Sequence, residues 1–339
     1  MKEQFERYSR QMLFAPIGEA GQRMLMDKAV LIVGMGALGT VLANHMVRAG
    51  VGLVRFADRD YVEKSNLQRQ MLYDEDDVKH MYPKVIAAKK KLSKINSDVQ
   101  LEAIVADVTV HNIESLLEGI DLVLDGTDNF QTRFLLNDAC YKLDIPFTYG
   151  GAVSSRGMSA IYVPGVTPCL RCFIQSGDSG GQTCDTIGVI APIVDIVASY
   201  QAVEALKYLV DAHEQRRNSL ITFDIWHNHS FEMKFGVPAE NCPCCQLKEY
   251  PALHPEEQDP FTSLCGRDTI QITGSSKLDL EKWRLRLEPI TKVSAFPFLL
   301  RAELPEGERL VLFPDGRVLV QGTDDIVRAK TLYARYIGL

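Results

Sequence analysis

Three closely spaced glycines form the first segment whose residue types and spacing favour chemistry. Gly34, Gly36 and Gly39 follow a short apolar run and open a helical pattern. Backbone N–H groups at such a turn, together with the helix dipole, favour phosphate binding. Asp58 lies 19 residues after Gly39, at the end of the next apolar run, where a carboxylate accepts hydrogen bonds from ribose hydroxyls. These four residues predict nucleotide binding over simple helix packing, without separating NAD from ATP.

Three polar and cationic residues beyond Asp58 favour a triphosphate. Asn66 and Arg69 follow closely in the segment Asn66-Leu67-Gln68-Arg69-Gln70, and Lys84 follows Pro83 at an expected helix start. A guanidinium fork and an ammonium group suit the charge of a triphosphate. The alternative for each residue is a solvated loop position. For Lys84 this alternative is weakened, because a cation at a helix N-terminus opposes the helix dipole.

An acidic residue lies in the segment Gly126-Thr127-Asp128-Asn129, directly after an expected strand. The carboxyl ends of strands are where ligands bind in open α/β sheets. Asp128 is therefore a candidate ligand of Mg²⁺. The alternative is that Thr127, Asp128 or Asn129 only caps the helix that begins there.

Two cysteine pairs predict a structural zinc site. Cys169 and Cys172 form one C-x2-C pair, and Cys242 and Cys245 form another within Cys242-Pro243-Cys244-Cys245. Four thiolates at this spacing make a closed tetrahedral Zn²⁺ site, with no position for an exchangeable ligand. Cys244 is an extra thiol, and the choice of Cys245 over Cys244 rests on both pairs then sharing one spacing. His227 and His229 are a further, weaker source of ligands.

Cys184 is the candidate nucleophile. It ends a Gly- and Ser-rich segment and precedes a long helical pattern, and a helix N-terminus lowers the pKa of a thiol. Asp185 is adjacent and would raise that pKa, and a loop cysteine is often inert. Both interpretations remain open from the residues alone.

The elements that must position these residues alternate between strand and helix. This rhythm predicts an α/β fold with a doubly wound, Rossmann-like and mainly parallel sheet. The expected strands are 29–33, 53–57, 101–105, 121–124, 158–163, 170–174, 220–225 and 230–235, and the expected helices are 15–26, one from the glycine segment to 48, 83–95, 112–117, 130–143 and 189–210.

A Pro-rich, acidic segment divides the 339-residue chain. We expect an adenine-nucleotide-binding domain with its zinc site at 1–248, a linker at 249–260 and a small α+β module at 261–339. In that module the expected elements are strands 269–272 and 298–303, a hairpin about 314–316 and a helix 324–336.

Composition excludes several classes of function. A formal charge of −7 argues against a nucleic-acid-binding surface. The longest apolar run, 187–210, contains three charged residues and is not expected to span a membrane. The charged N-terminus lacks the apolar core of a signal peptide, and tight cysteine clusters favour metal binding in a reducing compartment. These features predict a cytoplasmic protein.

Several motifs in a shared order resemble those of the ThiF/MoeB/HesA family, the bacterial relatives of ubiquitin-activating enzymes. The resemblance covers about residues 5–248. The motifs are Arg7-Tyr8-Ser9-Arg10-Gln11, the glycine segment, Asp58 with Asp60, Ser65-Asn66-Leu67-Gln68-Arg69-Gln70, Pro83-Lys84, Thr127-Asp128-Asn129 and the two cysteine pairs.

The resemblance implies an adenylyltransferase, a nucleotidyltransferase that acts as a homodimer. Asp58 would hold ribose, while Asn66, Arg69 and Lys84 would hold the phosphates of ATP and Asp128 would bind Mg²⁺. Arg10 would reach into the ATP site of the partner subunit. The implied substrate is a ubiquitin-like sulfur carrier protein with a Gly-Gly C-terminus. In some members a cysteine at the position of Cys184 becomes covalently linked to that carrier.

Alternatives remain within and outside this family. The carrier would be ThiS of thiazole (thiamine) synthesis, which the context of Cys184 and the tail favour, or MoaD of molybdenum cofactor synthesis. A sulfur donor protein is a further partner that the sequence leaves unnamed. An NAD-dependent oxidoreductase would leave Arg69, Lys84 and the cysteine pairs unexplained. A non-catalytic carrier-binding scaffold is the remaining alternative. For the tail we hypothesise carrier docking or dimer support.

Overall fold

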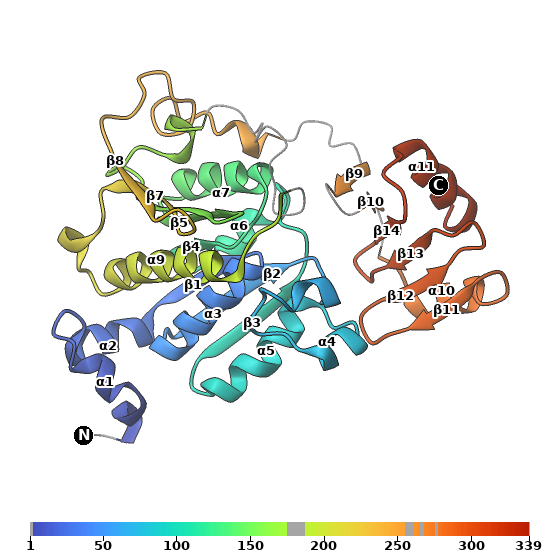
Figure 1. Cartoon of the computed structure of the whole chain (residues 1–339), viewed down its shortest axis with the longest axis horizontal. Coiled ribbons are helices and arrows are strands. Elements are labelled where there is room, and N and C mark those ends of the chain that lie inside the picture. Colours follow the sequence, from blue (N-terminus) through green and yellow to red (C-terminus); the bar gives the residue numbers. More distant parts are fainter. Residues whose placement is uncertain (1–2, 175–186, 255–260, 265–267, 275–276, 339) are drawn as a thin grey trace. The chain divides into compact units, whose positions relative to one another are not determined.

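The chain forms two compact units in the computed structural model, which describes residues 3–174, 187–254, 261–264, 268–274 and 277–338 (Figure 1). The first unit contains residues 1–75 and 83–255, and the second contains residues 76–82 and 256–339. Each unit has its own sheet. They are therefore described separately.

The first unit contains an eight-stranded sheet with the order β3-β2-β1-β4-β5-β6-β7-β8. The first five strands in this order pair in parallel, and the last three pair antiparallel. The prediction of a doubly wound, mainly parallel sheet is confirmed. The strands are β1 (Ala29–Val33), β2 (Leu53–Asp58), β3 (Gln100–Val105), β4 (Leu122–Asp125), β5 (Phe147–Val153), β6 (Arg156–Tyr162), β7 (Ser219–Asp224) and β8 (His229–Lys234).

Helices cover both faces of this sheet. The α-helices are α1 (Ser9–Met12), α2 (Gly18–Asp27), α3 (Ala37–Ala49), α5 (Lys84–Ile95), α6 (Ile113–Leu117), α7 (Phe130–Lys142) and α9 (Ala191–Leu209). α3 packs with α5 and α9, while α6 packs with α7. In β1, Leu31 and Val33 belong to the core cluster that includes α6 and α7, whereas Ile32 faces Gly39 of α3. Alternate residues of β1 thus point to opposite faces, as a strand requires.

Two segments of the first unit differ from the expected strands. β5 was absent from the expected elements because it contains Gly150 and Gly151, which are depleted from strands. A Cβ atom on Gly150 would lie 2.1 Å from Oε1 of Gln201, so α9 lies against the strand where the side chain is missing. The expected strand 170–174 is wrong, since the short 3-10 helix Leu170–Cys172 occupies that segment. The chain turns between Cys169 and Cys172, so this segment is not extended.

The second unit contains a six-stranded antiparallel sheet with the order β11-β12-β13-β14-β10-β9. Ile270, Leu310, Val320 and Leu332 are among the residues of its core. The expected α+β module is confirmed, although α10, β9 and β11 were not predicted. The elements are α4 (Glu75–Lys79), which begins in the first unit, then β9 (Phe261–Leu264), β10 (Thr269–Thr273), α10 (Leu280–Leu287), β11 (Lys292–Ala295), β12 (Leu300–Glu303), β13 (Arg309–Leu312), β14 (Arg317–Gln321) and α11 (Ile326–Tyr336).

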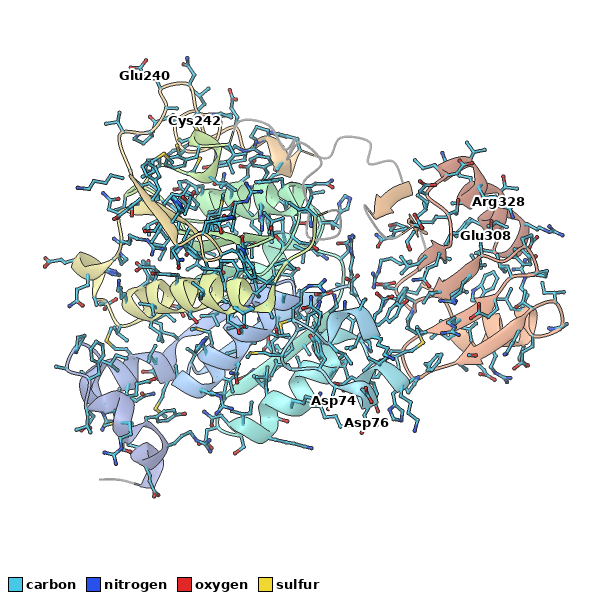
Figure 2. The ribbon with its side chains drawn as sticks, in the orientation of Figure 1. Asp74, Asp76, Glu240, Cys242, Glu308 and Arg328 are labelled. Carbon is cyan, nitrogen blue, oxygen red and sulfur yellow. The ribbon has the colours of Figure 1, made fainter. Side chains whose placement is uncertain are left out.

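Ion pairs hold α11 to the loop before β13. Arg328 donates from Nε and Nη2 to the two carboxylate oxygens of Glu308, at 2.6 and 3.1 Å, and both residues are labelled in Figure 2. Arg335 and Tyr336 contact Glu306 in the same loop. A two-pronged arginine–carboxylate pair adds geometric specificity to the packing of the helix.

Candidate functional site

The loop between β1 and α3 lies against the end of β4, and glycines permit this approach. Gly34 has a φ of +87°. A Cβ atom on Gly34 would lie 2.8 Å from the carbonyl oxygen of Gly126, and one on Gly39 would lie 1.9 Å from the carbonyl oxygen of Gly34. Among the described residues, a Cβ atom on Gly36 would meet only Nε2 of Gln70, at 3.8 Å. Packing therefore explains Gly34 and Gly39, whereas Gly36 is the glycine at which a ligand can approach the backbone.

Asp58 ends β2 and holds this loop. Its Oδ2 accepts a hydrogen bond of 2.6 Å from the N–H of Met35, and its Oδ1 accepts one of 2.7 Å from the N–H of Asp60. Burial raises the pKa of Asp58, and the charge of Lys84 opposes that rise. Each carboxylate oxygen keeps a further lone pair, so Asp58 can still accept hydrogen bonds from two ribose hydroxyls.

Lys84 is the first residue of α5 and is almost fully buried, with 3% exposure. Its Nζ lies 2.9 Å from Oδ2 of Asp60. A cation at a helix N-terminus is unfavourable, but here the carboxylate of Asp60 neutralises the charge of Lys84. The sequence indicates Asp60 only as part of a family motif, and the structure shows that it is the partner of Lys84.

Asn66 ends the 3-10 helix Lys64–Asn66, and Arg69 lies in the turn that follows it. Asn66 is 4% exposed, and its Oδ1 accepts a hydrogen bond from the N–H of Glu63. Within the described residues no partner is recorded for the amide nitrogen of Asn66, which remains a donor for a ligand. Arg69 is half-buried, and within the described part of the chain it donates only to the carbonyl oxygen of Ser65, at 3.1 Å. Both side chains therefore keep donors suited to phosphate oxygens.

Gln70 is a site residue that was not selected from the sequence. It is 4% exposed, its Nε2 lies beside Gly36, and its Oε1 is buried with no hydrogen-bond partner among the described residues. A buried amide oxygen without a partner in the protein usually accepts a hydrogen bond from a water or a ligand. The sequence feature that could have identified Gln70 is its position directly after Arg69.

Asp128 follows β4 and is exposed. The neighbouring Asn129 is the residue that caps α7, since its Oδ1 accepts a hydrogen bond of 2.8 Å from the N–H of Thr132. The capping role therefore falls to Asn129, and the carboxylate of Asp128 has no hydrogen bond or ion pair within the described part of the chain. An exposed carboxylate at this sheet edge can take a divalent cation.

A buried arginine fixes the backbone that carries Asp128. Nη2 of Arg133 donates to the carbonyl oxygens of Thr127 and Gly150, at 2.7 and 2.8 Å, and its Nε donates to Asp125 at 3.1 Å. The other oxygen of Asp125 accepts from both the N–H and the hydroxyl of Thr127. Burial raises the pKa of Asp125, and the charge of Arg133 opposes that rise. Sequence reasoning missed this pair.

Arg10 lies on the N-terminal arm, in α1, and is exposed. The residues around it are anchored: the Tyr8 hydroxyl accepts a hydrogen bond of 2.8 Å from Asn96, and Gln11 donates to Gln22 and to the carbonyl oxygen of Ala49. Arg10 itself makes no ion pair or hydrogen bond to any described residue. The structure therefore does not bring Arg10 together with the nucleotide site of its own chain.

The four cysteines of the predicted zinc site converge. The sulfur atoms of Cys169, Cys172, Cys242 and Cys245 all lie within 4.8 Å of one another, and Cys242 is labelled in Figure 2. Tetrahedral Zn–S bonds of 2.3 Å place thiolate sulfurs about 3.8 Å apart. The cluster thus has the donor set and the size of a closed zinc site. His227 pairs instead with Asp224, at 2.9 Å.

Backbone N–H groups favour Cys242 as a ligand. Burial raises the pKa of its thiol, but the N–H groups of Cys245 and Cys244 help to bring that pKa below its ordinary value. Cys244 is fully buried and lies outside the four-sulfur cluster. Its sulfur accepts a hydrogen bond of 3.1 Å from Nδ2 of Asn137.

The middle of α7 supports the cysteine cluster. Oδ1 of Asn137 accepts a hydrogen bond from the N–H of Leu170. Asp138, which is fully buried, receives two hydrogen bonds from Arg171, at 2.7 and 2.8 Å, and one from the N–H of Ala252. Such supporting contacts hold metal ligands in place. The same helix therefore holds the backbone next to Asp128 through Arg133 and supports the cysteine cluster through Asn137 and Asp138.

The candidate nucleophile Cys184 lies outside the described residues. Among the described residues no helix is long and apolar enough to cross a membrane. The remaining candidate residues fall into three groups in space: the nucleotide site, the arm with Arg10, and the cysteine cluster.

The chain is similar to known proteins over most of its length. Residues 8–244 match the ThiF family. A Bacillus subtilis (strain 168) sulfur carrier protein ThiS adenylyltransferase is 47% identical over 98% of this chain and 99% of its own. The Escherichia coli K12 protein of the same description is 36% identical, over 71% of this chain and 95% of its own. A crystal structure of E. coli MccB, 24% identical, superimposes with a TM-score of 0.61 over 71% of this chain and 72% of its own, which shows the shared fold. The chain belongs to the ThiF family.

Proposed function

We propose that this protein uses ATP to adenylate the C-terminal Gly-Gly carboxylate of a ubiquitin-like sulfur carrier protein, and that this carrier is ThiS. The observation that carries the proposal is the 47% identity to a ThiS adenylyltransferase over nearly the whole of both chains. The geometry supports it, because the glycine loop, Asp58 and Lys84 form one connected site. A carboxylate is already anionic at neutral pH, so the reaction needs positioning and charge neutralisation rather than a general base.

The roles of the side chains follow from their donors and charges. Asp58 accepts hydrogen bonds from ribose, Gly36 offers its backbone to phosphate, and Asn66, Arg69 and Lys84 hold the phosphates. Asp128 is the ligand we propose for Mg²⁺. When bound with the nucleotide, Mg²⁺ supplies neutralisation of the charge on the phosphate oxygens. The 2.9 Å ion pair with Asp60 holds Nζ of Lys84 in place.

Zn²⁺ is the metal we propose for the cysteine cluster, in a structural role. Four thiolate donors select zinc over Mg²⁺ or Ca²⁺, which prefer oxygen. The six cysteines that the structure describes are all free of disulfide bonds. That state supports a reducing compartment, and we place the reaction in the cytoplasm.

A homodimer completes the proposed site with Arg10 from the partner subunit. Leu13 and Phe14, which follow Arg10, are 74% and 60% exposed, and Tyr200 and Val203 of α9 are 39% and 49% exposed. α9 is apolar on most of its surface, and such helices are usually buried. These exposed apolar residues support a subunit interface near the arm.

Mixed dimers test the contribution of Arg10. Arg10→Ala and Lys84→Ala should each abolish most activity, whereas purified heterodimers of the two variants should regain about half of the wild-type activity, because symmetry leaves one of two sites intact. Steady-state adenylation of the carrier gives the measurement. If Arg10 acted within its own chain, each of the two sites in the heterodimer would lack either Arg10 or Lys84. No activity would then return.

The tail is proposed to be a separate module, with domain boundaries at 1–248, 249–260 and 261–339. The E. coli relative acts on ThiS by its description and matches only 71% of this chain, while the B. subtilis relative matches 98%. These coverages indicate that the B. subtilis relative has a counterpart of the tail, whereas the E. coli relative of the same description is matched without one. We retain carrier docking or dimer support as its proposed role.

Intact-protein mass spectrometry tests the substrate. After incubation with ATP and Mg²⁺, we expect AMP on ThiS and a much slower reaction with MoaD. A covalent adduct between carrier and enzyme that is lost in Cys184→Ser would assign the nucleophile. AMP on MoaD alone would move the function to molybdenum cofactor synthesis, and AMP on neither would favour a carrier-binding scaffold. Adding candidate sulfur donor proteins to the adenylated carrier then identifies the next partner.

A further inference from the structure

The buried hydroxyl group of Tyr73 lies between two elements of the nucleotide site. Its oxygen is 2.7 Å from the carbonyl oxygen of Met35 and 3.2 Å from that of Lys84. Tyr73 is 7% exposed, and its backbone N–H donates to the carbonyl oxygen of Gln70. We propose that Tyr73 is a positioning residue that orients the phosphate-binding N–H of the glycine loop. This inference rests on the proposed use of ATP.

The glycine loop is held on both sides of one residue. The N–H of Met35 donates to Asp58 at 2.6 Å, and the carbonyl oxygen of Met35 accepts from Tyr73. In a planar trans peptide, the C=O of one residue and the N–H of the next point in opposite directions. The hydrogen bond from Tyr73 directs the carbonyl oxygen of Met35 towards the protein interior. The N–H of Gly36 therefore points away from the interior. Gly36 is the glycine whose Cβ side is almost open.

The same hydroxyl connects the loop to the start of α5. The shorter distance, 2.7 Å, favours the Met35 carbonyl as the main acceptor of the hydroxyl proton, while the Lys84 carbonyl, the first of α5, lies 3.2 Å from the same oxygen. Lys84 and Gly36 are the two groups proposed to meet phosphate from opposite elements. Tyr73 thus sets their separation before the nucleotide arrives, which reduces the ordering that binding must impose.

Tyr73→Phe isolates the hydroxyl group. Phenylalanine retains the packing of the ring and leaves the fully buried Met35 without the donor to its carbonyl oxygen. Loss of a buried hydrogen-bond partner corresponds to about a 10-fold change in an equilibrium constant. The loss should appear in triphosphate binding, because adenosine depends on Asp58 rather than on the N–H of Gly36.

The experiment compares the full-length wild type, Tyr73→Phe and Tyr162→Phe. Tyr162 is a matched control: it is fully buried, and its hydroxyl has no hydrogen-bond partner in the described part of the chain. Calorimetric titration gives Kd for ATP with Mg²⁺, competition gives Kd for adenosine, and thermal midpoints report folding. We expect Tyr73→Phe to raise Kd for ATP about 10-fold and to leave Kd for adenosine within about twofold. Tyr162→Phe should change neither.

Each other outcome overturns the inference. Equal weakening of ATP and adenosine, or weakening of neither, would show that the hydroxyl does not orient the phosphate-binding N–H. A thermal midpoint for Tyr73→Phe far below that of Tyr162→Phe would assign the hydroxyl a general structural role. A wild-type protein that binds adenosine and ATP with the same affinity would remove the proposed function itself, and the positioning role with it.

Discussion

Asp128→Asn should lower the rate of carrier adenylation by about 100- to 1,000-fold, because a cation that neutralises phosphate charge is worth several kcal/mol. The exposed carboxylate makes no internal hydrogen bond or ion pair among the described residues, so the fold should be unaffected. Single-turnover formation of carrier-AMP gives the rate, and pull-down of the carrier gives binding. Binding should persist while chemistry is lost, which separates an enzyme from a scaffold.

The adjacent Asn129 supplies the control. Asn129→Ala removes the cap of α7 and should cost about 1 kcal/mol of stability, without removing a ligand of the proposed cation. If Asn129→Ala were as inactive as Asp128→Asn, loss of local structure rather than loss of charge would explain both. If Asp128→Asn kept wild-type activity, the proposed Mg²⁺ ligand would be wrong.

Cys245→Ser should remove bound zinc and lower the free energy of unfolding by more than about 4 kcal/mol, since metal binding to such sites contributes directly to folding. Atomic emission gives the metal content, and chemical unfolding gives the stability. A chelator should have a comparable effect on the wild type.

Cys244→Ser is the matched control for the metal site. Cys244 lies outside the four-sulfur cluster and accepts a hydrogen bond from Asn137, which a serine oxygen can also accept. One zinc ion per chain should therefore remain. Loss of zinc in Cys244→Ser with retention in Cys245→Ser would instead make Cys244 the fourth ligand.

Much of the fold could be predicted because local patterns and tertiary packing agree. β1, with its bounds of Ala29–Val33, is apolar throughout and lies between neighbouring strands on both sides. β5 could not be found this way, since Gly150 is required by the approach of Gln201 from α9, a residue distant in sequence. Leu170 is buried beside the cysteine cluster, but it lies in a short 3-10 helix and not in a strand.

The site could be predicted to the extent that single residue types carry chemistry. Residue type alone indicates a charge at Asp58 and Lys84 and metal binding at the cysteine pairs. Gln70, Tyr73 and Arg133 do not, because their importance depends on which backbone carbonyl or loop each one meets in the folded chain. Asp60 became visible only through the lysine that it neutralises.

The cysteine cluster also has a consequence for synthesis of the chain. Cys169 and Cys242, whose sulfur atoms lie 3.4 Å apart, are separated by 73 residues. At about 5 to 20 residues per second, the ribosome needs about 4 to 15 s to make that stretch. Throughout this interval the first pair of thiols has no second pair with which to share a metal. Newly made chains therefore pass through a period in which two cysteines are open to oxidants and to competing ions, and this period ends only when the second cysteine pair has been made.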